Sequence, residues 1–180
     1  MDDTTNIRFI NLFILFTKNF FSGKEHSLFI PGYQRGYKWA VKKYPDEDSS
    51  VEYFVRSHIE ISKNKSNEVF LQGITVYEDT TKNPIRIEIV DGQQRITTLY
   101  LLLWCLNSEN IKDCSLKYSS RKDTQDLLNN LKNTNFIAEF TISSKDSQDD
   151  TFVKEAILQI KELLKHLNKE QKNSLAQKVH

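Results

Sequence analysis

The sequence predicts an α+β domain, because a β-hairpin pattern and several helical patterns occur within one chain of 180 residues. The strand pattern is clearest from Ile85 to Val90, where isoleucines alternate with other side chains at a period of two. The helix pattern follows at once: Ile96, Leu99 and Leu103 are spaced as on one face of a helix. A small sheet with flanking helices is therefore expected.

Composition limits the class of protein. The formal net charge is +1, so any nucleic-acid-binding surface must be a local patch. The apolar run Phe13–Phe16 is far too short to span a bilayer, and no membrane association is expected. Asp2 and Asp3 are unlike the basic start of a secretory signal. Cys105 and Cys114 lack metal-ligand spacing, so a reduced, cytoplasmic protein is predicted.

The first third of the chain predicts a helix near residues 11–19 and a strand over Ser27–Ile30 that Pro31 terminates. A second helix is expected over Val51–Ile61, with Ser49 or Ser50 as its N-cap. His58 lies on the apolar stripe of this helix and is interpreted as a packing residue.

The middle of the chain predicts a hairpin followed by a helix. Glu68–Tyr77 has a strand pattern with Gly73 inside it, and a polar turn, Asp79–Pro84, connects it to the Ile85 strand. The period changes at Asp91-Gly92. The strand should therefore end there, and a helix should begin at Gln93 or Gln94 and run to Cys105 or Leu106.

The remainder predicts a short strand over Ser115–Tyr118, a helix over Arg121–Leu131 and a strand over Phe136–Ile142. A long helix should begin near Asp149-Asp150-Thr151. Asn168–His180 has few apolar positions and is expected to be frayed or to lead into further protein. We therefore divide the chain into a domain, 1–145, and a C-terminal helical extension, 146–180, that leads into downstream domains.

The Asp91-Gly92 junction carries the first candidate site. Glycine permits backbone conformations that other residues avoid, and a helix start offers free N–H groups to an anion. Arg95 in the first helical turn would add a charged donor, which makes phosphate the natural ligand. The alternative is that these residues only shape a strand-to-helix turn.

A second candidate segment is aromatic and basic, Tyr33–Trp39. Its rings beside Arg35 and Lys38 have the composition that stacks a base and holds a phosphate, although the aromatic residues are equally suited to covering a core edge. The polar and basic side chains of both segments are not needed to form a hydrophobic core. We therefore expect the two segments to converge at one functional site. Gln34 and Arg35 should lie beside Gln94 and Arg95 around one solvent-accessible cleft.

Several common chemistries are absent from the sequence. It has no Gly-rich loop ending in Lys-Ser/Thr, and its histidines are too scattered for a His-Asn-His metal nuclease. It has neither a Gly-x-Ser-x-Gly motif nor a Cys/His pair. Among many carboxylates, only Asp91 is placed beside candidate phosphate-binding groups.

The two segments carry a resemblance. Ile30–Trp39, IPGYQRGYKW, is similar to the I-P-x-Y-Q-R-x-Y-x-W motif of the N-terminal domain of GmrSD-type restriction proteins. Asp91–Leu99, DGQQRITTL, resembles the D-G-Q-Q-R-L-T-T-L motif of the same family, which contains domains of unknown function 262. Leu71–Ile74 and Tyr118–Arg121 lie where the family has weaker motifs. The resemblance covers most of residues 7–165.

The resemblance implies a ParB/sulfiredoxin-like fold, a small mixed β-sheet flanked by helices. It also implies binding and hydrolysis of a nucleoside triphosphate with Mg²⁺, in defence against phage DNA that is often modified. Many members carry a C-terminal HNH nuclease domain, which these residues lack, so no nuclease activity is expected here. The alternatives are a nucleotide- or DNA-sensing module without turnover, and a purely structural role for both motifs.

Under the first hypothesis each motif residue has an expected role. Asp91 would hold the metal or polarise water, Arg95 would neutralise phosphate charge, and Gln94 would orient the water. Arg35 would supply a second phosphate contact. The full set expected at the nucleotide is Tyr33, Gln34, Arg35, Gly92, Gln93, Arg95 and Thr97.

Overall fold

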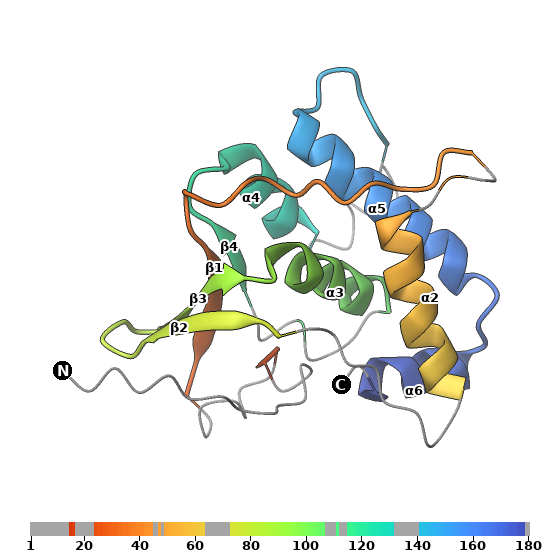
Figure 1. The fold of residues 1–180 in the computed structure, drawn as a ribbon, viewed down its shortest axis with the longest axis horizontal. Coiled ribbons are helices and arrows are strands. Elements are labelled where there is room, and N and C mark those ends of the chain that lie inside the picture. The colour runs from red at the N-terminus through yellow and green to blue at the C-terminus, as the bar shows by residue number, and fades with distance from the viewer. Residues whose placement is uncertain are drawn as a thin grey trace.

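The fold is seen in a computed structural model that describes residues 15–16, 24–44, 47, 49–63, 73–106, 111, 115–131 and 141–178. Within these residues the chain has the predicted α+β class, with one mixed four-stranded sheet and five helices (Figure 1). The elements are β1 (His26–Ile30), α2 (Ser50–Lys63), β2 (Thr75–Asp79), β3 (Ile85–Asp91), α3 (Gln93–Cys105), β4 (Leu116–Tyr118), α4 (Lys122–Asn130), α5 (Gln148–Leu164) and α6 (Lys169–Lys178).

The sheet has the strand order β2-β3-β1-β4. β1 is central and runs parallel to both β3 and β4, whereas β2 pairs with β3 as an antiparallel hairpin. The three parallel strands consequently end at the same edge, at Ile30, Asp91 and Tyr118. In open α/β sheets ligands bind outside the carboxyl ends of such strands. Both candidate motifs begin at this edge.

One face of the sheet lies on the core. Leu28, Ile30, Ile87 and Ile89 are buried there, as the alternation in the sequence requires. α3 belongs to the same core cluster, which explains why ten of its residues are buried. On the opposite face of the sheet, the guanidinium of Arg86 lies over the Phe29 ring, 4.6 Å from its centroid.

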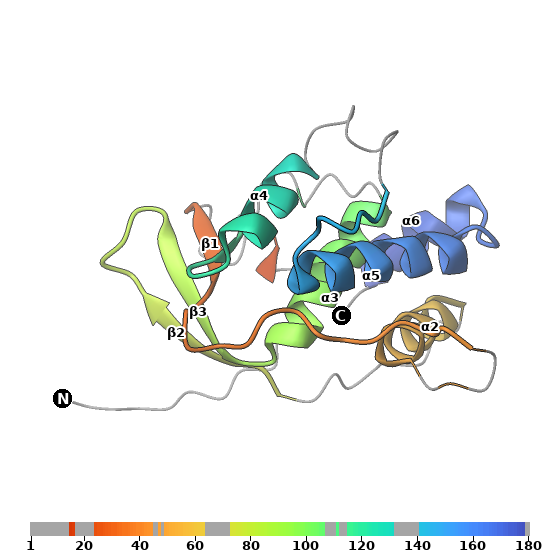
Figure 2. The ribbon, with the colours of Figure 1, turned by 90° about the horizontal axis from the view of Figure 1, so that it is seen from above.

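α3 lies between the sheet and a second layer of helices (Figures 1 and 2). α5 packs against α3, α2 and α4, and α6 packs against α2. The apolar side chains of α5 therefore share the hydrophobic core of the sheet domain, and the division at residue 145 stays a prediction. The long segment between β1 and α2 runs from the sheet edge, past the start of α3, to the helical layer (Figure 2).

Several element boundaries differ from those expected. β2 begins at Thr75, so Gly73 precedes the strand instead of lying inside it. α5 begins at Gln148, because the Ser147 hydroxyl accepts the Asp150 N–H and caps the helix earlier than expected. Asn168–His180 was expected to be the end of a helical extension that is frayed or leads into further protein, and α6 forms there over Lys169–Lys178, where Leu175 is buried and the helix packs against α2.

The other expectations have mixed outcomes. Ser49 caps α2 as predicted, accepting the Glu52 N–H at 3.1 Å. Most of the helix expected near 11–19, most of the strand expected over Phe136–Ile142, and Leu71-Gln72 lie outside the described residues. In the part of the chain that the structure describes, no helix is long and apolar enough to cross a bilayer.

Candidate functional site

The junction between β3 and α3 has the predicted form. β3 ends at Asp91 and α3 begins at Gln93, with Gly92 as the N-cap. Gly92 has a φ of 92°, in the left-handed region that other residues avoid. A Cβ at this position would also lie 2.9 Å from Cγ1 of Ile74. Both conformation and space therefore require glycine here.

The two motifs are in direct contact, as expected, whereas the solvent-accessible cleft between them stays a prediction. The Gln93 side-chain amide donates to the carbonyl of Arg35. The Gln94 amide accepts the Lys38 N–H at 2.8 Å and donates to the carbonyl of Gly36 at 3.0 Å. Both glutamine side chains are buried, so they fasten the segment 35–38 across the first turn of α3.

The beginning of the first motif is fastened to β3 instead. Gln34 Nε2 donates to the carbonyl of Val90 at 2.7 Å, and the Tyr33 hydroxyl donates to Glu88 Oε1 at 3.5 Å. Desolvation, followed by the charge of Glu88, raises the pKa of Tyr33. The Tyr33 ring nevertheless remains 69% exposed, which leaves its face accessible for stacking.

The charged side chains of the motifs lie at the surface to different degrees. Arg35 and Lys38 are exposed, and the Asp91 side chain is 73% exposed. Arg95 is more sheltered: its Nη2 donates to the carbonyl of Gly73 at 2.9 Å and lies 3.4 Å from Asp91 Oδ2. Arg35, Lys38 and Asp91 are thus accessible from solvent, whereas Arg95 is partly covered.

The residues around Asp91 set a limit on any metal site. Among the described residues, no group of three or more His, Cys, Asp or Glu side chains is close enough to hold a metal ion. Mg²⁺ commonly binds through one or two carboxylates and completes its shell with water and substrate phosphates. The exposed Asp91 carboxylate fits that mode of binding.

A buried hydroxyl cluster lies beneath the helix start. Thr97 is fully buried, and its Oγ1 lies 2.7 Å from the Tyr118 hydroxyl. Burial raises the pKa of Tyr118 to about 12, against the lowering effect of hydrogen bonds from Thr97 and Gln93. The Tyr37 hydroxyl bonds Thr98 at 2.8 Å in the same layer. Thr97 was expected at the nucleotide, but its hydroxyl points into this cluster.

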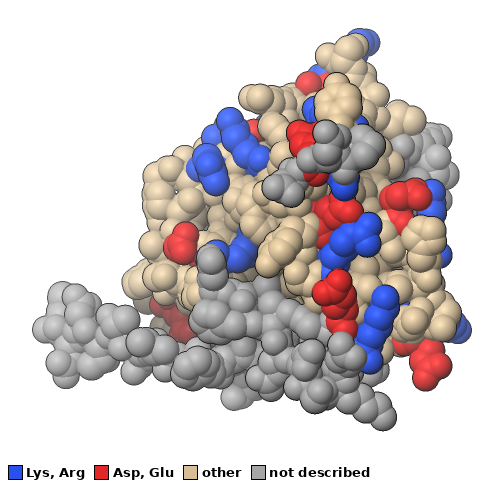
Figure 3. All heavy atoms as spheres, turned by 45° about the vertical axis from the view of Figure 1, so that its right-hand side comes forward, with Lys and Arg blue, Asp and Glu red and all other residues tan. Residues whose placement is uncertain are grey.

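The described surface also has a depression of about 270 Å³, which lies over α2 and is lined by Lys42, Glu52, Tyr53 and Arg56 among others. None of the predicted site residues lines it. Acidic and basic side chains alternate on this side of the molecule (Figure 3). A surface of mixed charge favours neither an anionic nor a cationic ligand.

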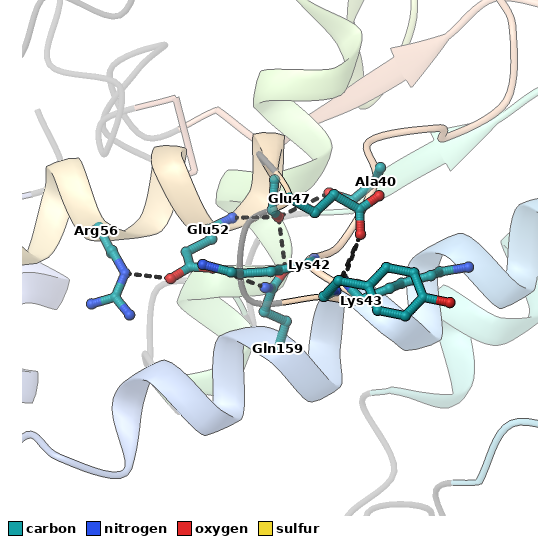
Figure 4. Close-up of polar contacts among 9 residues, drawn as sticks. Ala40, Lys42, Lys43, Glu47, Glu52, Arg56 and Gln159 are labelled. Carbon is teal, nitrogen blue, oxygen red and sulfur yellow. Dashed lines mark hydrogen bonds and ion pairs between the residues drawn. The ribbon is translucent and has the colours of Figure 1, made fainter.

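The same region is a structural junction (Figure 4). Gln159 Oε1 of α5 accepts from the Ser49 hydroxyl at 3.0 Å and from the Lys42 N–H at 3.4 Å, and Arg56 pairs with Glu52 at 2.6 Å. These contacts hold the segment after Trp39 to α2 and α5. We therefore place the candidate site at the sheet edge and not in the depression.

The sequence had no direct signal for the residues that support the site from other elements. Tyr118 and Arg121 belong to a segment that resembled only a weak family motif. In the sequence, Asp149 is recognisable only as an acid at a helix start. Arg121 and Asp149 lie at the site only because β4 and α5 reach the same sheet edge. No local sequence pattern predicts that arrangement.

Comparisons with known proteins place these motifs in a family. Neither the curated proteins nor the solved structures gave a significant match, so the ParB/sulfiredoxin-like likeness stays a prediction. The family model described as "GmrSD restriction endonuclease, N-terminal domain" matches residues 17–179, which include both motifs and every described element. The chain therefore belongs to the N-terminal domain family of the GmrSD restriction endonuclease.

Proposed function

We propose that this chain is a nucleoside triphosphate-binding, and triphosphate-hydrolysing, regulatory domain of a restriction system. Family membership indicates a defence-related role. The observation that supports nucleotide binding is that the Gln93 and Gln94 amides hold the Arg35-containing segment across the first turn of α3. Cations from two distant segments are thereby gathered at a helix start, an arrangement suited to phosphate.

In this proposal each group of the two motifs has one task. Arg35 and Arg95 neutralise the phosphates, and the exposed ring of Tyr33 stacks on the base. Asp91 would hold Mg²⁺, which would supply Lewis-acid chemistry at the phosphates. The backbone at Gly92 lets the phosphates approach the chain closely. Gln34, Gln93, Gln94 and Thr97 act as supports, because each already has a protein partner.

The partners follow from the family and belong to the same proposal. Modified phage DNA is the molecule to be sensed, and an HNH nuclease domain or subunit is the effector. The cytoplasm is the expected compartment for both.

A second function, nucleotide sensing without turnover, is favoured by one specific observation. Gln94 was expected to orient the attacking water, but both ends of its amide are bonded to the segment 36–38. Hydrolysis through Gln94 would require one of these bonds to be exchanged. Release of inorganic phosphate from ATP or GTP by the purified chain, with and without Mg²⁺, separates the two functions.

Binding itself is tested by calorimetry with ATP and GTP in the presence of Mg²⁺. Removing the Arg95 guanidinium deletes a charge-assisted contact, so Arg95→Ala should weaken affinity about 30- to 150-fold, or about 2–3 kcal/mol. Arg95→Lys should recover only part of this loss, because an ammonium lacks the planar fork. Asp91→Ala should reduce turnover more than binding, and without Mg²⁺ it should improve binding by removing a repulsive charge.

Arg56→Ala is the matched control. Arg56 is a surface arginine on α2 that pairs with Glu52, and it lies in the depression over α2, which no motif residue lines. The affinity of this variant should equal that of the unmodified chain. Thermal melting of Arg95→Ala is needed as well, since Arg95 also bonds the carbonyl of Gly73. Unchanged affinity in a folded Arg95→Ala protein would reject the phosphate role.

A further inference from the structure

A charged pair that neither motif contains lies at the same sheet edge. Arg121 follows β4 and directly precedes α4, and its Nη1 lies 3.2 Å from Oδ2 of Asp149 in the first turn of α5. Ser119, two residues before Arg121, donates its N–H to the carbonyl of Ile30 at 3.0 Å. Arg121 thus lies where β1 and β4 end side by side.

The carboxylate of this pair packs against Gly36 of the first motif. A Cβ built on Gly36 would lie only 2.1 Å from Asp149 Oδ2, so the carboxylate occupies the space of the missing side chain. Gly36 is the neighbour of Arg35, and its carbonyl is bonded to Gln94. Asp149 therefore brings the guanidinium of Arg121 next to the segment that carries the exposed Arg35.

The two partners of the pair differ in exposure. The Asp149 side chain is only 12% exposed, whereas the Arg121 side chain is 40% exposed. The buried Nε of Arg121 has no hydrogen-bond partner within the described part of the chain. A planar guanidinium has five N–H donors, so Arg121 can keep Asp149 and still bind another anion.

We propose that Arg121 is a further binding residue for the phosphates of the nucleotide, and that Asp149 lowers the affinity of this site by opposing the negative charge of the ligand. The inference rests on the proposed function. Asp149 fixes the position of Arg121 through the ion pair, and its charge acts on any phosphate held by Arg121. The carboxylate keeps the anion site from being strongly attractive when no ligand is bound.

The two residues have opposite expected effects, which a purely structural pair would not have. Arg121→Gln removes a donor and a positive charge, so the affinity for Mg²⁺–ATP or Mg²⁺–GTP should fall about 10- to 100-fold. Asp149→Asn keeps the shape against Gly36 but removes the negative charge. Its affinity should rise about 3- to 10-fold. Arg121→Lys should retain part of the binding.

Calorimetry on these variants tests the inference, with Arg56→Gln as the control for an arginine ion pair elsewhere on the surface. Unchanged affinity in a folded Arg121→Gln protein, while Arg95→Ala loses binding, overturns the inference and leaves the proposed function standing. If Arg121→Gln does not fold, weaker or unchanged binding by Asp149→Asn overturns it. If the unmodified chain binds neither nucleotide, the proposed function and this inference both fail.

Discussion

His58 shows how one side chain links burial to pH. It is 4% exposed on α2, its Nδ1 lies 2.6 Å from the carbonyl of Phe54, and its Nε2 has no hydrogen-bond partner among the described residues. The ring packs 4.4 Å from the Phe54 ring, measured between centroids, as a packing residue should. Burial lowers the pKa of His58 below its ordinary value of 6.5.

This lowered pKa predicts that the free energy of unfolding falls in acid. The unfolded chain binds a proton at His58 below about pH 6.5, while the folded chain resists protonation until lower pH. The stability contributed by neutral His58 is therefore present above the ordinary pKa and is lost as the pH falls below it. His58→Phe should reduce the change of the urea unfolding midpoint between pH 7.5 and pH 5. His166→Gln, at an exposed position, should leave the slope unchanged.

At the scale of the element, Gln94 decides how the segment 35–38 is attached to α3. It satisfies one backbone N–H and one carbonyl of that segment while being only 8% exposed. Gln94→Leu leaves both groups without a partner and should lower the free energy of unfolding by about 1–3 kcal/mol for each group that stays buried. Urea unfolding measures this, with Gln148→Leu at an exposed position of α5 as the control.

Gln94→Glu refines the same test. It keeps an acceptor for the Lys38 N–H but turns a carboxylate toward the carbonyl of Gly36. We expect it to be less stable than the unmodified protein. Equal stability of both Gln94 variants and the unmodified protein would show that the amide is not a structural support.

At the scale of the whole molecule, α5 joins the helical layer to the core of the sheet domain. Ile157 is fully buried in the shared core, whereas its neighbour Leu158 is 42% exposed. Ile157→Ala should therefore lower the free energy of unfolding by about 2–5 kcal/mol, because it leaves a cavity. Leu158→Ala should change it by less than about 1 kcal/mol. Similar losses for both variants would contradict the described packing.

Sequence patterns correctly predicted the helices and strands that are determined by neighbouring residues. The strand-to-helix change at Asp91-Gly92 follows from a change of period and one glycine, and the structure has it where expected. The C-terminal segment was expected to belong to a helical extension, but the bounds of α6 were not predicted, because this helix depends on the burial of Leu175 and on packing against α2 and not on its own weak apolar pattern. The burial of Gln93 and Gln94 was likewise unpredictable, since it requires another segment to cross the helix start.

The central position of β1 has a consequence for the order of folding. Leu28 of β1 pairs with Ile87 on one side and with Leu116 on the other, so β1 is synthesised before either of its partner strands. Contacts between residues so far apart in sequence slow folding, because a long loop must close before they form. We therefore expect β1 to leave the ribosome before its partners, and the sheet edge to form only after Tyr118 at the end of β4 has been synthesised.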